Sequence, residues 1–256
     1  MSDPAEGRFA PGAGPESSAN SSFARPLSAE SPTLGADARP HVFVDDLDAP
    51  SLHPDDRRHL ERSLRTRPGD GITITDGAGR WRPALMGDPV EPAGDIRVVA
   101  PGKPPITVGV SLLKGRKLDT VVQKLTELGV DRIQLLEAER CVTRWSAEKG
   151  DRILDRLARV AREAAMQSRR CRLPEIVPPA PAMPVLGEAD VAVAHMDGGP
   201  VSLDQPTIVI GPEGGWSVDE LGAARHRVAL GPHVLRAETA AIVAGALLGA
   251  QRLAVV

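Results

Sequence analysis

Cysteine is scarce in this chain of 256 residues, and its two copies, Cys141 and Cys171, exclude two kinds of stabilising site. A disulfide framework needs several regularly spaced cysteines, and a structural zinc site needs cysteines or histidines at short fixed spacings. Neither pattern is present. We therefore expect two reduced thiols, as is usual in the cytosol, and no bound metal.

Long apolar runs are also missing. The longest candidate, residues 240–250, is rich in alanine and glycine and falls short of the roughly 20 residues that a membrane-spanning helix needs. The N-terminus lacks the basic segment followed by an apolar core that marks a secretory signal. These absences predict a cytoplasmic protein that does not bind a membrane.

An excess of basic residues, typical of proteins that bind nucleic acid, is the third absence, since the net charge is −3. The first 38 residues hold five of the 34 acids but only two of the 31 bases, which leaves 29 of each in the rest of the chain. Binding to nucleic acid would therefore depend on local basic clusters. Residues 1–38 are Ala, Ser, Pro or Gly at 24 positions, a composition that predicts a disordered extension.

A glycine-rich loop follows the β-branched run at 207–210, which favours a buried strand. Three glycines at 211–215 (GPEGG) allow positive φ angles and the close approach of a ligand to the backbone. Ser217 and Glu220 then form a capping-box pattern that starts a short helix. The loop matches neither the P-loop pattern nor the dinucleotide-binding fingerprint.

A second loop repeats this arrangement. A short strand at 227–230 ends at Gly231-Pro232, and residues 235–239 lead into a helix rich in small residues. Either loop alone is most simply an ordinary turn. Together they predict a ligand crevice at the carboxyl edge of a parallel sheet, where open α/β sheets bind their ligands.

The rest of the chain divides into two parts. Residues 39–101 predict a small β-rich domain, with strands at 41–44, 72–75, 81–86 and 95–99 and one helix at 53–64. Residues 106–256 alternate strand and helix, which is typical of a parallel α/β sheet. The proline-rich segment 101–105 predicts a stiff linker between them.

The two loops, as IGPEGGWSVDE (210–220) and LGPHVLRAETA (230–240), resemble the paired motifs of the RsmE family of ribosomal RNA methyltransferases, of the SPOUT class. The resemblance covers about residues 39–256. It implies that residues 106–256 form a SPOUT-type parallel sheet with a C-terminal trefoil knot. It also implies that residues 39–101 form a PUA-like RNA-binding barrel.

The resemblance further implies a reaction. In this family a methyl group passes from S-adenosylmethionine to N3 of uridine 1498, in standard numbering, of the 16S ribosomal RNA of the small subunit. The family is homodimeric, with its site near the interface. The residues expected to hold the cofactor are His195, Ile210, Gly211, Pro212, Glu213, Gly214, Gly215, Leu230, Gly231, Leu235, Arg236, Ala237, Glu238 and Thr239.

Basic clusters are the candidates for RNA contacts. Arg58, Arg62 and Arg65 have the spacing of one helical face, which is usually a solvated face but here has few acids beside it. The expected RNA-binding set is Arg39, Arg58, His59, Arg62, Arg65, Arg67, Lys114 and Lys117. His41 stands where family members often have arginine.

The end of the long helix predicted over 153–164 carries the catalytic candidates. The resemblance places Gln167, Ser168 and Arg170 at the substrate site, although arginines there would also favour the helix C-terminus. Methylation requires loss of the N3 proton of uridine, so Arg170 is expected to stabilise the resulting anion. Met166 replaces a glutamate that is frequent in the family, which removes one acid–base candidate.

Two alternatives stay open. Another SPOUT methyltransferase, acting on tRNA or on a ribose 2′-oxygen, would share the glycine loops but not the basic N-terminal domain. A non-catalytic RNA-binding factor for ribosome assembly would need a damaged cofactor loop, whereas these loops are intact.

Overall fold

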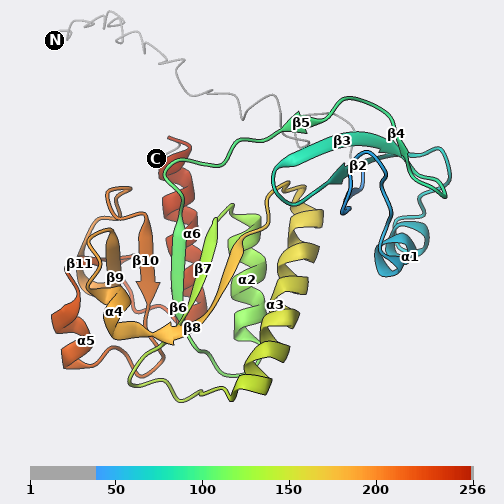
Figure 1. Ribbon diagram of the computed structural model, residues 1–256. Coiled ribbons are helices and arrows are strands. Elements are labelled where there is room, and N and C mark those ends of the chain that lie inside the picture. The colour runs from blue at the N-terminus through green and yellow to red at the C-terminus, as the bar shows by residue number, and fades with distance from the viewer. Residues whose placement is uncertain (1–38, 255–256) are drawn as a thin grey trace, which may run out of the picture.

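The computed structural model describes residues 39–254, and the extension predicted at 1–38 lies outside them. A β-rich N-terminal domain is followed by an α/β domain (Figure 1). No helix in the described part of the chain is long and apolar enough to cross a membrane.

The N-terminal domain is built on a five-stranded sheet of order β1-β2-β3-β4, with β5 also paired to β3. Its strands are β1 (His41–Phe43), β2 (Gly71–Thr75), β3 (Arg80–Leu85), β4 (Glu91–Pro92) and β5 (Arg97–Val98). As predicted, the turn at 76–79 joins two antiparallel strands, β2 and β3. Within residues 39–254 no pairing closes this sheet, so the PUA-like barrel stays a prediction.

Helix α1 (Pro54–Arg62) covers this sheet with Leu60, which is completely buried. Its first turn carries Asp55 and Asp56, where the helix dipole favours negative charge. The helix ends at Arg62, two residues earlier than predicted, and Arg65 adopts a left-handed conformation with φ 56°. The prediction that Arg58, Arg62 and Arg65 share one helical face is therefore wrong, because Arg65 lies outside the helix.

The C-terminal domain contains a six-stranded sheet of order β11-β9-β10-β6-β7-β8. Every neighbouring pair is parallel, as the alternation of strands and helices predicts. Its strands are β6 (Thr107–Ser111), β7 (Arg132–Glu137), β8 (Glu175–Pro181), β9 (Val191–Gly199), β10 (Thr207–Ile210) and β11 (His226–Val228). Strand order does not define how the chain threads, so the trefoil knot stays a prediction.

Helices cover this sheet and complete its core. They are α2 (Lys117–Glu127), α3 (Ala147–Ser168), α4 (Ala182–Leu186), α5 (Val218–Ala223) and α6 (Ala237–Arg252). Helix α2 packs between α3 and α6, and its apolar face of Leu118, Val121, Val122 and Leu125 is buried, as its spacing predicts.

Strand β8 was not predicted, because its sequence EIVPPAP contains three prolines. Proline cannot donate a hydrogen bond to a neighbouring strand, so it is tolerated mainly at sheet edges. Among the described strands β8 is such an edge and pairs only with β7. The prolines therefore mark the border of the sheet rather than a loop.

The two domains meet at the C-terminal end of α3 (Figure 1). Arg162 of α3 donates to both oxygens of Asp56 of α1, at 2.8 and 2.5 Å, and lies 5.2 Å from the centre of the Phe43 ring. The segment after α3 also bonds to the N-terminal hairpin, where Gly79 N donates to the Cys171 carbonyl at 2.9 Å. The junction is therefore held by backbone bonds and by a half-buried ion pair.

Candidate active site

A crevice of about 640 Å³ opens at the carboxyl edge of the parallel sheet, where the two glycine loops follow β10 and β11. Neighbouring parallel strands bring their carboxyl ends to one edge, so loops separated in sequence come together. The end of β9, with His195, forms another part of the wall. The predicted crevice is therefore present at the predicted edge of the sheet.

Glycine is required at two places on this wall. Gly215 has φ 71° and Gly231 has φ 158°, both in the region that side chains disfavour. A Cβ atom at either residue would meet no protein atom within 4 Å, so the space beside each is open. Both residues line the crevice, so bare backbone faces the volume that a ligand would fill.

The first glycine loop is fixed by the start of α5. Ser217 and Glu220 make the predicted capping box, with Ser217 N donating to Glu220 Oε2 at 2.9 Å. The other carboxylate oxygen accepts from Glu139 N at 2.8 Å, on the loop after β7. Glu220 is 2% exposed, so this bond network ties two loops together from within the protein.

Apolar side chains form much of the crevice, including Leu230 and Leu235 of the second loop. The Trp216 ring packs on Gly211, where a Cβ atom would come within 2.9 Å of the indole. The buried Trp216 Nε1 has no hydrogen-bond partner among the described residues. A ligand with a flat apolar group and hydrogen-bonding edges suits this combination of apolar walls and exposed backbone.

A cluster of charges lies at one side of the crevice. Lys117, the first residue of α2, donates to Glu213 Oε1 at 2.5 Å and lies 3.6 Å from Glu238 Oε2. The hydrogen bond to Glu213 raises the pKa of Lys117. Lys117 was predicted to contact RNA phosphate, but the structure places it beside the carboxylates of both glycine loops.

Eleven of the 14 predicted cofactor residues line the crevice. Gly214, Glu238 and Thr239 do not, although each is adjacent in sequence to a residue that does. The lining residues that sequence reasoning missed are Ala194, Met196, Trp216, Leu221, His233, Val234 and Ala240. Trp216 had a visible signal, because it directly follows the first glycine loop.

The catalytic candidates lie elsewhere in the same chain. Helix α3 runs antiparallel to the strands, so Gln167 and Ser168 are at the amino edge of the sheet, opposite to the crevice (Figure 1). Ser168 Oγ donates to the Ala164 carbonyl at 2.8 Å, a bond within the helix. None of the three candidates lines the crevice.

Arg170 is engaged in a buried charge network. Its guanidinium donates to the Thr126 carbonyl at 3.0 Å and lies 3.6 Å from Asp131, which also binds Arg252. Burial lowers the pKa of Arg170 to about 10. Its side chain is only 13% exposed, so this geometry gives no support to a catalytic cation within the chain and indicates a structural role.

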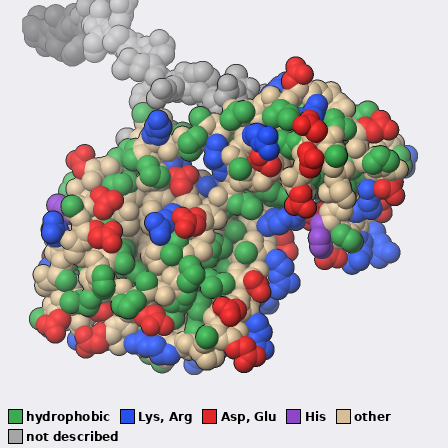
Figure 2. Space-filling model, viewed as in Figure 1, with side chains coloured by type: hydrophobic (Ala, Val, Ile, Leu, Met, Phe, Trp, Pro, Cys, Tyr) green, Lys and Arg blue, Asp and Glu red, His purple; other side chains and the backbone are tan. Residues whose placement is uncertain are grey.

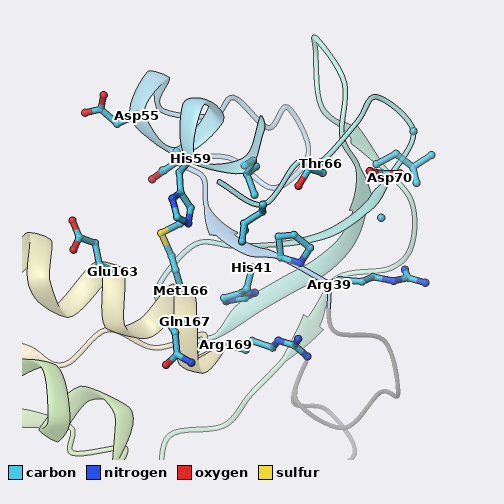
Figure 3. Close-up of a pocket in the computed structure, with 17 residues that line it drawn as sticks. Arg39, His41, Asp55, His59, Thr66, Asp70, Glu163, Met166, Gln167 and Arg169 are labelled. Carbon is cyan, nitrogen blue, oxygen red and sulfur yellow. The ribbon is translucent and has the colours of Figure 1, made fainter. Parts of the chain in front are cut away.

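A second hollow, of about 1320 Å³, lies between the domains (Figure 3). In the close-up, the side chains of His59 of α1 and Met166 of α3 point toward one another. Of the residues predicted at RNA or substrate, Arg39, His59 and Gln167 line this cleft. Met166, which replaces the glutamate frequent in the family, packs against the N-terminal core.

The basic residues of α1 and of the segment after it are more balanced by acids than predicted. Arg58 pairs with Asp55 at 3.2 Å, and Arg57 pairs with Glu61 at 3.7 Å. Lys and Arg side chains lie over α1 and along α3, with acidic side chains between them (Figure 2). Arg62, Arg65, Arg67 and Lys114 remain exposed, so their RNA contacts stay predictions.

His41 forms the floor of the cleft. It is 3% exposed, and its Nδ1 lies 2.8 Å from Thr73 Oγ1. Burial, with a smaller contribution from the nearby charge of Arg169, lowers the pKa of His41 to about 4. His41 is therefore neutral at pH 7 and does not replace the arginine that is frequent in the family.

Known proteins match both the sequence and the fold. The family of the RNA methyltransferase domain matches residues 101–249. The ribosomal RNA small subunit methyltransferase E of Mycobacterium bovis is 34% identical over 223 residues, covering 76% of this chain and 84% of its own length. That of Synechocystis is 32% identical, covering 75% and 70%. The chain belongs to the RsmE family.

A solved structure supports the same assignment. The RsmE enzyme of Neisseria gonorrhoeae, bound to S-adenosylmethionine, superposes with a TM-score of 0.66 at 25% identity. The match covers 81% of this chain and 95% of that one, so it includes both domains. The similarity to RsmE enzymes is therefore not limited to the glycine loops but includes most of the chain.

Proposed function

We propose that this chain methylates N3 of uridine 1498 of 16S ribosomal RNA, with S-adenosylmethionine as methyl donor. The observation that carries the proposal is the crevice, where open space lies beside Gly215 and Gly231. The similarity to small-subunit RNA methyltransferases supports it. The alternatives of a tRNA or ribose methyltransferase, or of an assembly factor, receive no comparable support.

The crevice residues fit S-adenosylmethionine. Leu230, Leu235 and the Trp216 ring provide apolar surface for an adenine ring, and the glycine loops provide backbone groups for its polar edge. Trp216 Nε1 is a donor that finds no partner within residues 39–254, and a bound ligand can satisfy it. When bound, the cofactor supplies a methyl group on a positively charged sulfur.

RNA is expected to contact the N-terminal domain and the cleft between the domains. Arg39 and His59 line this cleft, and Arg62 and Arg67 lie on nearby exposed surface. The charges of these arginines would hold the RNA backbone, whereas the methyl transfer takes place at the crevice. The crevice and the cleft are at opposite edges of the sheet, so we infer that a homodimer brings the cleft of one chain near the crevice of the other.

Methylation of ribosomal RNA tests this function directly. Small ribosomal subunits from a strain without the gene are incubated with the protein and labelled S-adenosylmethionine, then digested to nucleosides for mass spectrometry. We expect 3-methyluridine, and its loss when uridine 1498 is changed to cytidine. Label in a 2′-O-methyl nucleoside, or in tRNA alone, would contradict the proposal.

A further inference from the structure

The charge pair at the side of the crevice is accessible to a ligand. The side chains of Lys117 and Glu213 are 37% and 45% exposed, and both residues line the crevice. Surface ion pairs of this kind contribute little to stability. Their position beside the glycine loops therefore calls for a functional explanation.

Glu238 supports this pair from behind. It lies in the first turn of α6 and outside the crevice lining, and its Oε2 is 3.6 Å from Lys117 Nζ. This oxygen is buried and makes no hydrogen bond within the described residues. Lys117 therefore keeps a nearby negative charge even when Glu213 turns to another partner.

The Lys117–Glu213 pair complements one edge of uracil. That edge presents the acceptor O4, the donor N3–H and the acceptor O2, in this order. An ammonium beside a carboxylate presents a donor next to an acceptor. Cytosine has no proton on N3 and carries an amino group in place of O4, so the same pair would oppose it at both atoms.

We propose that Glu213 accepts the N3 proton of the target uridine and that Lys117 stabilises the uridinate through a carbonyl oxygen. This inference rests on the proposed function. Both groups come from elements that also form the crevice, α2 and the loop after β10. They supply the base and the cation that the reaction needs, since Arg170 is held at the opposite edge of the sheet.

The step balances without another reagent. The N3–H bond breaks, and the proton joins the carboxylate of Glu213 while the electron pair stays on N3. The neutral acid no longer attracts Lys117, which then donates to the uridinate oxygen and is still paired with Glu238. The N3 electron pair forms a bond to the methyl carbon, and the carbon–sulfur bond breaks with its electrons on sulfur. Glu213 releases its proton to water afterwards.

Substitution of the base is the first test. Glu213→Gln keeps the size of the side chain but removes its basicity, so turnover at saturating RNA should fall about 100-fold. Lys117→Met should cause a loss of about the same size, because the uridinate loses its cation. Turnover is measured at saturating S-adenosylmethionine, and its loss should exceed any loss of cofactor affinity in both variants. Arg116→Gln, a neighbouring cation that is 82% exposed, serves as the control with unchanged turnover.

Chemical rescue separates a base from a structural residue. Small subunits made with 5-fluorouridine carry a more acidic N3–H, so they need less help from a base. Glu213→Gln should recover at least 10-fold of its lost rate on this RNA. Glu238→Gln, which only positions Lys117, should lower turnover by a smaller factor without changing the affinity for S-adenosylmethionine.

The outcomes distinguish this inference from the function on which it rests. If the wild-type protein makes no 3-methyluridine, the proposed function fails. If the wild-type is active and Glu213→Gln keeps its turnover, Glu213 is not the base. A loss in Glu213→Gln that 5-fluorouridine does not reduce would also overturn the inference, because it would indicate a structural effect.

Discussion

The crevice at the glycine loops and the cleft between the domains are built from different parts of the chain. The crevice is formed largely by backbone and apolar side chains that follow the ends of parallel strands. The cleft is lined by side chains of two domains and includes more charged and polar groups, among them Arg39, His59 and Glu163. The first depends on local conformation within one domain, whereas the second depends on how two domains pack.

This difference affects which substitutions each hollow tolerates. At Gly215 any side chain strains the backbone and enters open space, so the position has few substitutes. At the cleft, the exposed Asp55 is paired with Arg58, and such surface charges can be exchanged at little cost. Substitutions that strain a glycine loop should therefore disturb the crevice more than exchanges of paired surface charges disturb the cleft.

The largest effect is expected at Asp131, which belongs to neither hollow. Asp131→Ala leaves the buried guanidinium groups of Arg170 and Arg252 without their carboxylate and removes a bond from Ile106 N. Unpaired buried charges should lower the free energy of unfolding by about 4 kcal/mol, measured by urea denaturation.

The variant Arg170→Met tests whether Arg170 acts in stability or in catalysis. If Arg170 is structural, folded Arg170→Met protein should keep the wild-type turnover at saturating RNA while its unfolding midpoint falls. A stable variant with a turnover loss of two orders of magnitude would instead restore Arg170 as the catalytic cation, contributed across a dimer interface.

The contacts of Arg170 could not be predicted from the sequence, whereas the glycine loops could. The glycine loops were identified because their function is local, as a strand end, a positive φ angle and a helix cap are all visible within a few residues. The partners of Arg170, by contrast, are distant in sequence, since Thr126 and Asp131 lie about 40 residues before it. No local pattern indicates that these groups meet.

The contrast between local patterns and distant contacts also explains how the predictions for α2, β8 and Lys117 turned out. Amphipathic spacing predicted the buried face of α2, and prolines concealed β8 because a lone edge strand tolerates them. Lys117 was assigned to RNA because its neighbours Lys114 and Arg116 are basic. Its true partners are Glu213 of the first glycine loop and Glu238 of α6, about 100 and 120 residues further along the chain, and the order of the strands brings them together.

The second largest effect is a loss of stability at low pH, caused by the buried His41 of the cleft. Burial lowers the pKa of His41 to about 4 from its ordinary value of 6.5, so the folded protein resists its protonation. The unfolded chain binds a proton below pH 6.5 and the folded chain does not, so stability is lost as the pH falls from 6.5 to 4. The expected loss is about 3 kcal/mol.

Urea denaturation at a series of pH values measures this loss. His41→Gln should reduce the pH dependence in this window, whereas His53→Gln, at a histidine whose side chain is 65% exposed, should retain it. An equal pH dependence in His41→Gln and the wild-type protein would show that His41 is not the group responsible.

The smallest effect comes from a matched pair of glycines, one in each hollow. Gly215 has φ 71° and lines the crevice, while Gly69 has φ 89° and lines the cleft. A Cβ atom at either meets no protein atom within 4 Å, so valine imposes a similar backbone strain at both. Only Gly215→Val places a branched side chain in the volume proposed for S-adenosylmethionine. Its affinity should fall by about 2 kcal/mol, roughly 30-fold.

Calorimetric titration of both variants with S-adenosylmethionine, alongside urea denaturation, separates strain from obstruction. Both variants should lose similar stability, because the strain is shared, but Gly69→Val should bind the cofactor like the wild-type protein. If the two variants lose affinity equally, the loss follows from strain rather than from contact. If neither loses affinity, the cofactor does not approach Gly215, and the open space beside that residue is not part of its binding site.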